Sequence, residues 1–219
     1  MARRSYSKQQ VADRREAILD AAMTVFEDGG IDAVSFRKVA AVLGCSYSAP
    51  YRYFASKEEL LTALRARAYR WIEEAMREAI APLSRPLDKL NALADAYIRA
   101  GLERPTRYAL MFFELQGSDL GQRSLELAVA KRDALGICTE VVTEANAVGE
   151  LPLATDPLTA SHLFWAGAHG LVSLQVSGQF VMGRSIDTLV PTMIRTLMAG
   201  LAQPVAEVEA PTTQPDRAG

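Results

Sequence analysis

The stretch that decides the fold is residues 35–54, which read SFRKVAAVLGCSYSAPYRYF. Its first part, Phe36–Leu43, repeats apolar residues at helical spacing and stops at Gly44, a residue type that commonly ends helices. The second part, Tyr47–Phe54, is expected to form another helix of about two turns. Two short helices joined by a tight turn that contains glycine make a helix-turn-helix, which places its second helix in the DNA major groove.

Residues of the turn and of the second helix each have an expected role. Cys45 fits as a small buried apolar residue, and Ser46 as the cap of the second helix. Proline is tolerated only in the first turn of a helix, so Pro50 predicts an irregular start. Hydroxyl groups suit phosphate oxygens, and Arg suits guanine or phosphate. The side chains expected to project outward and contact DNA are those of Tyr47, Ser48, Ala49, Tyr51, Arg52 and Tyr53, and Ser46 is also expected to contact DNA.

Phe54 is expected to end this helix and pack inward. The alternative to a helix-turn-helix is a plain helical bundle with a sharp turn, in which Tyr51 and Phe54 both belong to the core. Ser35 and Arg37 stand at the head of the preceding helix, where backbone N–H groups without helical partners offer a seat for phosphate. Lys57 is similarly placed at the start of the next long helix.

Charge is distributed unevenly along the chain. The net charge of all 219 residues is −2, but residues 1–70 hold 12 Lys and Arg against 8 Asp and Glu. The remaining residues hold 12 against 18 and are therefore acidic. A basic first third suggests that only this part meets phosphate, although a chance fluctuation of solvated charges would look the same.

Composition excludes several classes of protein. Hydrophobic residues make up 49% and charged residues 23%, as in an ordinary soluble globular protein. The two cysteines, Cys45 and Cys138, are far apart, which argues against a disulfide framework and a Cys-rich zinc site. The charged start has no apolar stretch behind it, so we expect no secretory signal and a cytoplasmic protein. We expect neither a metal nor another cofactor.

An uncharged segment from Pro157 to Gly183 is 27 residues long, enough to span a bilayer. Two histidines, two glutamines and several serines interrupt it, so a helix buried among other helices is the better interpretation, and no membrane partner is expected.

Helical spacing recurs along the whole chain, and it predicts an all-α fold. A first apolar stripe consists of Ile18, Ala22, Val25 and Phe26 and stops at Gly29-Gly30. Ser56, followed by Glu59, marks the cap of a long helix. The helices expected from there on cover about residues 57–79, 87–101, 105–116, 121–147, 157–178 and 187–201. We expect a DNA-binding head over residues 1–56, a ligand-binding and dimerisation body over 57–203, and a disordered tail over 204–219.

One family is similar over about residues 12–62. The matching pieces are Ile18–Ala22, Phe26, Gly29-Gly30, Ser35–Ala40, Leu43–Ser46 and Pro50–Leu61. In residue types and spacing they resemble the N-terminal domain of the TetR family of bacterial transcription regulators, although Pro50 is an uncommon variant. The resemblance implies an all-helical homodimer with small DNA-binding heads. By position, it implies phosphate contacts for Ser35, Arg37, Tyr51, Tyr53 and Lys57. It implies an approach to bases for Tyr47, Ser48 and Ala49.

A second pattern lies in the uncharged segment. One helical face carries His162, Trp165, His169, Val172 and Val176, and small residues lie between them. The 187–201 helix is also strongly apolar, so pairing both helices with those of a second copy predicts a four-helix dimer interface. The run from Trp165 to Gly170 also looks like a Trp-His-Gly signature of one C-terminal subgroup of that family.

Aromatic and methionine side chains with a few polar groups are typical of a small-molecule pocket. Candidate walls in the body are Tyr97, Tyr108, Met111, Phe112, Leu115, Phe164, Trp165, His169 and Met182. The same residues also describe a plain core. Basic residues are few in the middle helices, so an apolar or aromatic ligand is favoured over an acidic one.

The resulting prediction is a ligand-responsive DNA-binding regulator, a repressor released from a pseudo-palindromic operator by a small apolar or aromatic molecule. Repression follows from the family resemblance, since no residue distinguishes it from activation. The alternatives are a non-switching architectural DNA-binding protein and a helical hydrolase that uses His169.

Overall fold

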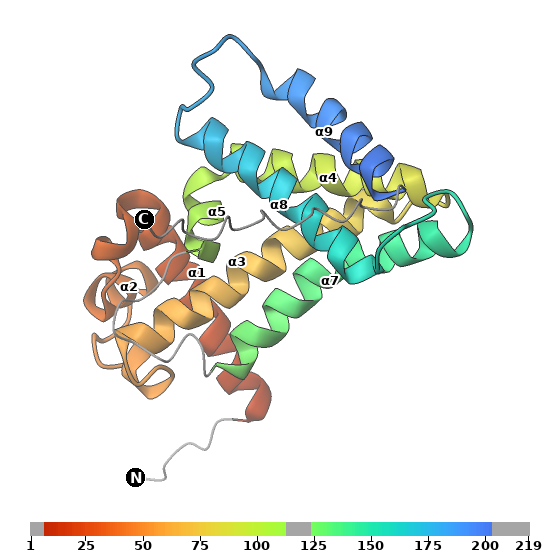
Figure 1. The fold of residues 1–219 in the computed structure, drawn as a ribbon. Coiled ribbons are helices and arrows are strands. Elements are labelled where there is room, and N and C mark those ends of the chain that lie inside the picture. Colours follow the sequence, from red (N-terminus) through yellow and green to blue (C-terminus); the bar gives the residue numbers. More distant parts are fainter. Residues whose placement is uncertain (1–6, 113–123, 203–219) are drawn as a thin grey trace, which may run out of the picture.

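Every regular element of the computed structural model is a helix within the residues that it describes, 7–112 and 124–202 (Figure 1). The all-α prediction is therefore confirmed. The elements are α1 (Lys8–Ala33), α2 (Phe36–Leu43), the short 3-10 helix η1 (Pro50–Arg52), α3 (Lys57–Ile80), α4 (Pro86–Glu103), α5 (Pro105–Phe112), α7 (Leu125–Ala147), α8 (Pro157–Val176) and α9 (Ile186–Leu201).

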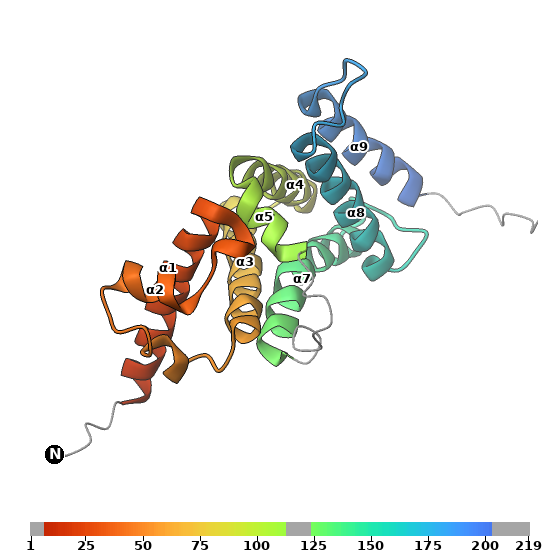
Figure 2. The same ribbon diagram turned by 90° about the vertical axis from the view of Figure 1, so that its left-hand side faces the viewer.

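α1, α2 and η1 gather at one end of the molecule, and α4 to α9 form the other (Figure 2). We call the first group the head and the second the body. The long α3 runs from the head into the body and packs against α1, α4, α5 and α7. Ser56 caps it as predicted, because its Oγ accepts a hydrogen bond from the Glu59 N–H at 3.2 Å. The Glu59 carboxylate accepts in turn from the Ala55 N–H at 2.7 Å.

The predicted stop of the first helix at Gly29-Gly30 is wrong in part. Gly30 leaves helical geometry with φ 70° and ψ −170°, but the chain continues as a helical turn to Ala33. The glycine therefore bends α1, since it adopts a positive φ that other residues avoid. On the N-terminal side of the bend, Ile18, Ala22 and Phe26 are buried, as the stripe predicted.

Acidic residues tie the head to the body. Glu126, in the first turn of α7, accepts from Arg15 of α1 and from Arg70 of α3, each at 2.7 Å. On the other side, Glu27 of α1 pairs with Arg107 of α5 at 2.6 Å. Ion pairs therefore fix α1 to α5 and α7 of the body, and they also fix α3 to α7.

Close helix packing in the body depends on glycine. A Cβ on Gly167 of α8 would lie 2.5 Å from the Met193 Sδ of α9, so the missing side chain allows the two helices to approach. α8 ends at Val176, and among the described residues no helix is long and apolar enough to cross a membrane.

The Glu126 cluster gives the first prediction. Burial alone would raise the pKa of Glu126, but the hydrogen bonds from Arg15 and Arg70 outweigh it and lower the pKa below the ordinary 4.5. A lowered pKa stabilises the fold fully above the unfolded value, and this contribution is lost as the pH falls through the folded value. We expect Glu126→Gln to reduce the free energy of unfolding by about 1 kcal/mol at pH 7.

Urea unfolding at pH 7 and at pH 3.5 measures this effect. The deficit of the variant should shrink toward the lower pH, because the parent carboxylate loses its charge as the pH falls through its folded pKa. Glu140→Gln is the control on the same helix, because Glu140 is exposed and faces Arg77 at 3.7 Å. An equal deficit for both variants would contradict the role given to Glu126.

Candidate nucleic-acid interface and internal cavity

The turn after α2 is built as the sequence predicted up to Gly44. Ser35 caps the start of α2, because its Oγ accepts from the Lys38 N–H at 3.3 Å. Gly44 ends the helix in the left-handed region with φ 64° and ψ 31°, and its N–H points back to the carbonyls of Ala40 and Ala41. This cap reverses the chain direction directly after α2.

The predicted second helix, Tyr47–Phe54, is replaced by a turn and the three-residue η1. Pro50 has no N–H with which to bond the Ser46 carbonyl, and that carbonyl accepts from the Ala49 N–H instead, at 2.9 Å. After η1, the N–H groups of Tyr53 and Phe54 both bond to the Pro50 carbonyl. The irregular start predicted from proline is therefore present, but it takes up most of the element.

Two expectations for the turn itself are wrong. Cys45 is exposed, because the Gly44 cap turns the chain outward and leaves only the Cys45 N–H bonded to α2, at the Ala40 carbonyl. Ser46 caps no helix, since its Oγ lies 3.4 Å from the Ser48 Oγ. Phe54, in contrast, is fully buried as expected, and the Arg15 guanidinium lies 4.8 Å above its ring.

Tyr47 and Tyr51 form an exposed aromatic surface on the head. Their side chains are 68% and 52% exposed. Tyr51 packs on Phe36 with ring centroids 4.1 Å apart, and Tyr47 meets the Tyr51 ring edge-on at 6.5 Å. Because Phe36 is buried, it fixes the Tyr51 ring from below while the outer face stays open. The alternative that placed Tyr51 in the core is therefore wrong.

All ten residues predicted to contact DNA reach solvent. The exposed ones are Arg37, Ser46, Tyr47, Ser48, Tyr51 and Arg52, and the half-buried ones are Ser35, Ala49, Tyr53 and Lys57. They come from the start of α2, the turn, η1 and the start of α3. The sequence analysis missed Lys38, which is exposed next to Arg37, and its signal was the pair of adjacent basic residues at a helix N-terminus.

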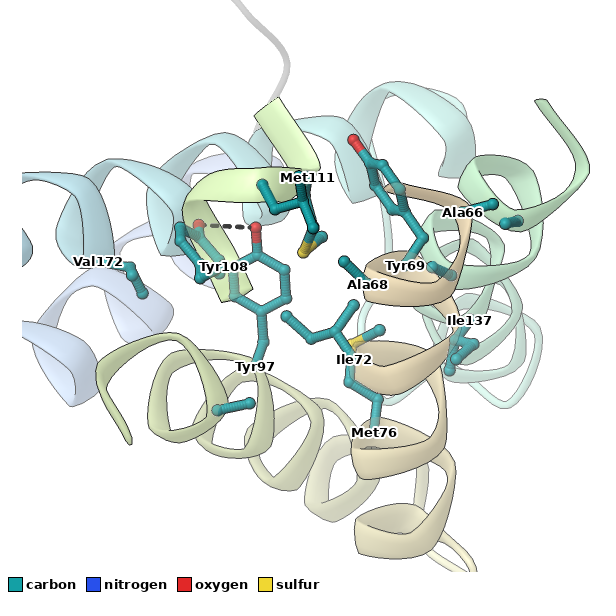
Figure 3. Close-up of a cluster of buried hydrophobic side chains, with 14 of the residues drawn as sticks. Ala66, Ala68, Tyr69, Ile72, Met76, Tyr97, Tyr108, Met111, Ile137 and Val172 are labelled. Carbon is teal, nitrogen blue, oxygen red and sulfur yellow. Dashed lines mark hydrogen bonds between the residues drawn. The ribbon is translucent and has the colours of Figure 1, made fainter. Parts of the chain in front are cut away.

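Inside the body lies a small apolar cavity of about 30 Å³. Of the predicted wall residues, the structure brings Tyr97, Met111, Phe164 and Trp165 to it. Figure 3 shows Tyr97 of α4 directed toward Tyr108, and Met111 of α5 on the side of Ile72 of α3, which also lines the cavity. The sequence analysis missed Met76, Cys138 and Met193, which also line the cavity and whose signal was only their place on apolar helix faces.

Tyr108, Phe112 and His169 form a layer beside this cavity, with the Phe112 and His169 rings 4.2 Å apart. Met182 is not brought to the cavity, because it lies 90% exposed in the connection between α8 and α9. Leu115 lies outside the described residues.

A chain of hydrogen bonds links the cavity wall to this layer. The Trp165 Nε1–H donates to the Tyr97 hydroxyl at 3.1 Å. The Tyr97 and Tyr108 hydroxyls lie 2.9 Å apart, as the dashed line in Figure 3 marks. The Tyr108 hydroxyl lies 2.7 Å from Nδ1 of His169, whose Nε2 lies 3.4 Å from the Ser173 Oγ.

Burial keeps the hydrogen-bonded side chains of Tyr97, Tyr108 and His169 uncharged. It raises the pKa of Tyr97 to about 12 and raises the pKa of Tyr108 further still. Burial also lowers the pKa of His169 below its ordinary value of 6.5. At neutral pH all three groups are therefore neutral, and each takes part as a hydrogen-bonding group.

The surroundings of His169 bear on the hydrolase alternative. One ring nitrogen faces a tyrosine and the other a serine, and in the described ranges no carboxylate bonds to the ring. A Ser-His pair of hydrolytic type would need such an orienting acid. Groups of three or more residues that could hold a metal ion do not occur in residues 7–112 and 124–202.

Comparisons with known proteins cover both parts of the chain. Residues 18–64 match the model of bacterial regulatory proteins of the tetR family, and residues 90–197 match that of the tetracyclin repressor-like C-terminal domain. The HTH-type transcriptional regulator Rv1816 of Mycobacterium tuberculosis is 28% identical over 205 residues, which cover 80% of this chain and 87% of that protein. The HTH-type transcriptional repressor KstR of the same species is 32% identical over 93 residues, 42% of each chain.

Solved structures agree with the fold. A protein from Rhodococcus sp. RHA1 superposes with a TM-score of 0.74 at 26% identity, over 92% of this chain and 100% of that chain. The transcriptional regulator FadR from Bacillus subtilis, in complex with stearoyl-CoA, superposes with a TM-score of 0.68 at 22% identity, over 84% of this chain and 98% of that chain.

Gly44 gives a prediction for the turn. A side chain at φ 64° is strained, so Gly44→Ala should lower the free energy of unfolding by about 1 kcal/mol. Gly136 is the matched control, because it lies inside α7 with open space around its Cβ position, and Gly136→Ala should raise stability by about 0.5–1 kcal/mol. Thermal unfolding checks both signs, and a neutral Gly44→Ala would contradict the cap.

His169 gives a second prediction. Because its pKa is lowered in the fold, its contribution to stability is full above pH 6.5 and is lost as the pH falls through the folded value. The parent should therefore lose stability between pH 7.5 and pH 5 relative to His169→Gln, as measured by urea unfolding. The exposed His162 supplies the control, and His162→Gln should follow the parent.

Proposed function

This chain belongs to the TetR family of bacterial transcription regulators, and we propose that it represses transcription by holding an operator through residues 35–57 until a small apolar or aromatic molecule enters the body. The observation that carries this proposal is the exposed Tyr47–Tyr51 surface next to basic residues on the head. Access to the chromosome makes the cytoplasm the expected compartment.

The chemistry of the head supports contact with DNA. Tyrosine and serine hydroxyls bond phosphate oxygens, and Arg37 and Lys38 add positive charge beside the N-terminus of α2. Tyr47 and Ser48, on the most exposed part of the turn, are our candidates for contact with base edges. Residues 1–56 are the proposed DNA-binding domain, and 57–203 the ligand-binding and dimerisation domain.

Two heads are needed to read a pseudo-palindrome. α8 and α9 pack together, and α8 leaves Leu163, Leu174 and Val176 exposed. On α9, Leu189 and Met198 are half-buried. Apolar side chains that reach solvent on two neighbouring helices favour pairing with the same helices of a second copy, as a four-helix interface. In such a homodimer the heads would contact half-sites about 34–36 Å apart.

Release requires that a ligand favour a different spacing of the heads. The cavity in the body is apolar, which suits an apolar or aromatic effector. The similar FadR fold was solved with stearoyl-CoA, and the relative KstR is a repressor. α3 joins the cavity wall at Ile72 and Met76 to its cap beside the head, so its tilt is the proposed transmitter. A coupling of about 1–3 kcal/mol would be sufficient.

Selection of bound fragments from a random DNA pool tests the proposal. It predicts enrichment of an inverted repeat that the protein binds as a dimer, which sedimentation of the complex measures. Enrichment of no sequence, together with sequence-independent binding, would favour the non-switching architectural alternative instead.

Substitutions separate the two kinds of DNA contact. Lys57→Gln should weaken binding to the selected duplex and to random DNA alike, and should reduce the slope of log affinity against log salt by about 1. Tyr47→Phe should change the preference among operator variants and leave the salt slope nearly unchanged. Lys131→Gln is the control, since Lys131 lies on α7 in the body. Parent-like isotherms for Lys57→Gln and Tyr47→Phe would contradict the proposed interface.

A further inference from the structure

The cavity wall has one hydroxyl group. Among the described residues that line it, Tyr97 supplies the only hydroxyl, and Trp165 supplies an indole N–H that already donates to Tyr97. The remaining lining side chains are aliphatic or aromatic, apart from the thiol and thioether sulfurs of Cys138 and three methionines. Among the lining residues, the Tyr97 hydroxyl is therefore the main group that could form a hydrogen bond with a ligand.

Which groups donate and which accept along these hydrogen bonds decides whether the Tyr97 hydroxyl can act as a donor or as an acceptor toward a ligand. A neutral imidazole has one donor and one acceptor nitrogen. If Nδ1 of His169 accepts, the Tyr108 hydroxyl donates to it and the Tyr97 hydroxyl donates to Tyr108. His169 then donates through Nε2 to Ser173. Every donor of the chain has a partner in this arrangement.

The opposite direction is less favourable. If His169 donated through Nδ1, Tyr108 would donate to Tyr97, which also accepts from Trp165. The Tyr97 O–H would then be left as a buried donor beside an apolar cavity, and a buried donor without a partner is costly. In the favoured direction the Tyr97 O–H is used, and the oxygen keeps an acceptor site.

We infer that the effector is an uncharged, mostly apolar molecule that donates one hydrogen bond, from a hydroxyl or an N–H group, to the phenolic oxygen of Tyr97. This inference rests on the proposed function and specifies the ligand class of the same site. Tyr97 is then the residue that determines specificity, while Tyr108 and His169 are positioning residues that orient its hydroxyl.

An ionised group does not suit this wall. The lining residues carry no charge, and burial of an unpaired charge costs far more than burial of a hydrogen-bonded hydroxyl. Arg65 of α3 is buried nearby and donates to the Met111 carbonyl at 3.4 Å, but it does not line the cavity.

Space for the ligand comes from flexible side chains. The cavity of about 30 Å³ is far smaller than the roughly 300–1,000 Å³ of an ordinary small-molecule site, so a ligand must widen it. Met76, Met111 and Met193 line it from α3, α5 and α9. Methionine has an unbranched side chain that repacks readily, which allows the wall to adapt around a chain or ring.

Three probes with eight carbon atoms test the inference. 1-Octanol donates and accepts hydrogen bonds, heptyl methyl ether has the same formula but only accepts, and octanoate is charged at pH 7.5. Quenching of Trp165 fluorescence in a Trp71→Phe background, with calorimetry on the parent protein, measures binding of each. We expect 1-octanol to bind about fivefold more tightly than the ether, the ordinary contribution of one hydrogen bond, and octanoate to bind weakest.

Variants locate the hydrogen bond. Tyr97→Phe should bring the ratio of the alcohol and ether affinities to about one while the ether still binds. Tyr69→Phe is the matched control, because Tyr69 is also a buried tyrosine but packs on Phe112 away from the cavity lining, and it should keep the parental ratio. If Tyr97→Phe does not fold, the ranking of the three probes on the parent protein still decides the question.

Four outcomes would overturn the inference: equal binding of the ether and the alcohol, tightest binding of octanoate, a parental ratio in a folded Tyr97→Phe, and binding of none of the probes. Failure of the proposed function looks different, because the parent protein would then bind no operator in the DNA selection. Operator binding without any of the probes bound would overturn the ligand class only.

Discussion

Packing of α3 is the constraint on which both parts of the structure depend. Its first turns, from Leu60 to Leu64, are buried, and its later turns around Ala68 and Ile72 are buried in the body. One continuous helix thus joins the buried residues of the head to those of the body within a single hydrophobic core. A helix held on so many sides has few ways to move, and any motion it makes is shared by the head and the body. The Ser56 and Glu59 cap fixes where that shared element begins.

α5 shows how closely the cavity and the head are connected. Tyr108 belongs to the hydrogen-bond chain beside the cavity. Its neighbour Arg107 pairs with Glu27 of α1 and lies 5.3 Å from the Trp71 ring of α3. Adjacent residues of one short helix therefore face two different parts of the molecule. A displacement of Tyr108 moves the partner of Glu27 as well, so the head is connected to the layer beside the cavity both through α3 and through this ion pair.

Much of the fold followed from local rules in the sequence, because caps and apolar stripes act over a few residues. Ser56 and Gly44 marked helix ends correctly, and the Ile18 to Phe26 stripe named buried residues. The predictions that Cys45 is buried and that Met182 lines the pocket were wrong. The exposure of both residues depends on where a turn directs the backbone, and residue type alone does not determine that direction. Pro50 correctly predicted an irregular helix start. The length of the helix after it depended on which backbone N–H groups bonded the carbonyls near Pro50, and this could not be predicted from the sequence. The hydrogen-bond chain from Trp165 to Ser173 joins α4, α5 and α8, and pairwise contacts between distant helices have no signature in one sequence.

The brevity of η1 has a consequence for how a duplex would be distinguished from its neighbours. A three-residue turn has room for few side chains that reach base edges, compared with the two or more turns of a full recognition helix. If the proposed interface reads DNA, part of its discrimination would come from groove width and from how easily a duplex bends, properties spread over many base pairs. A regulator of this kind would combine a few base contacts with the mechanical character of the whole site.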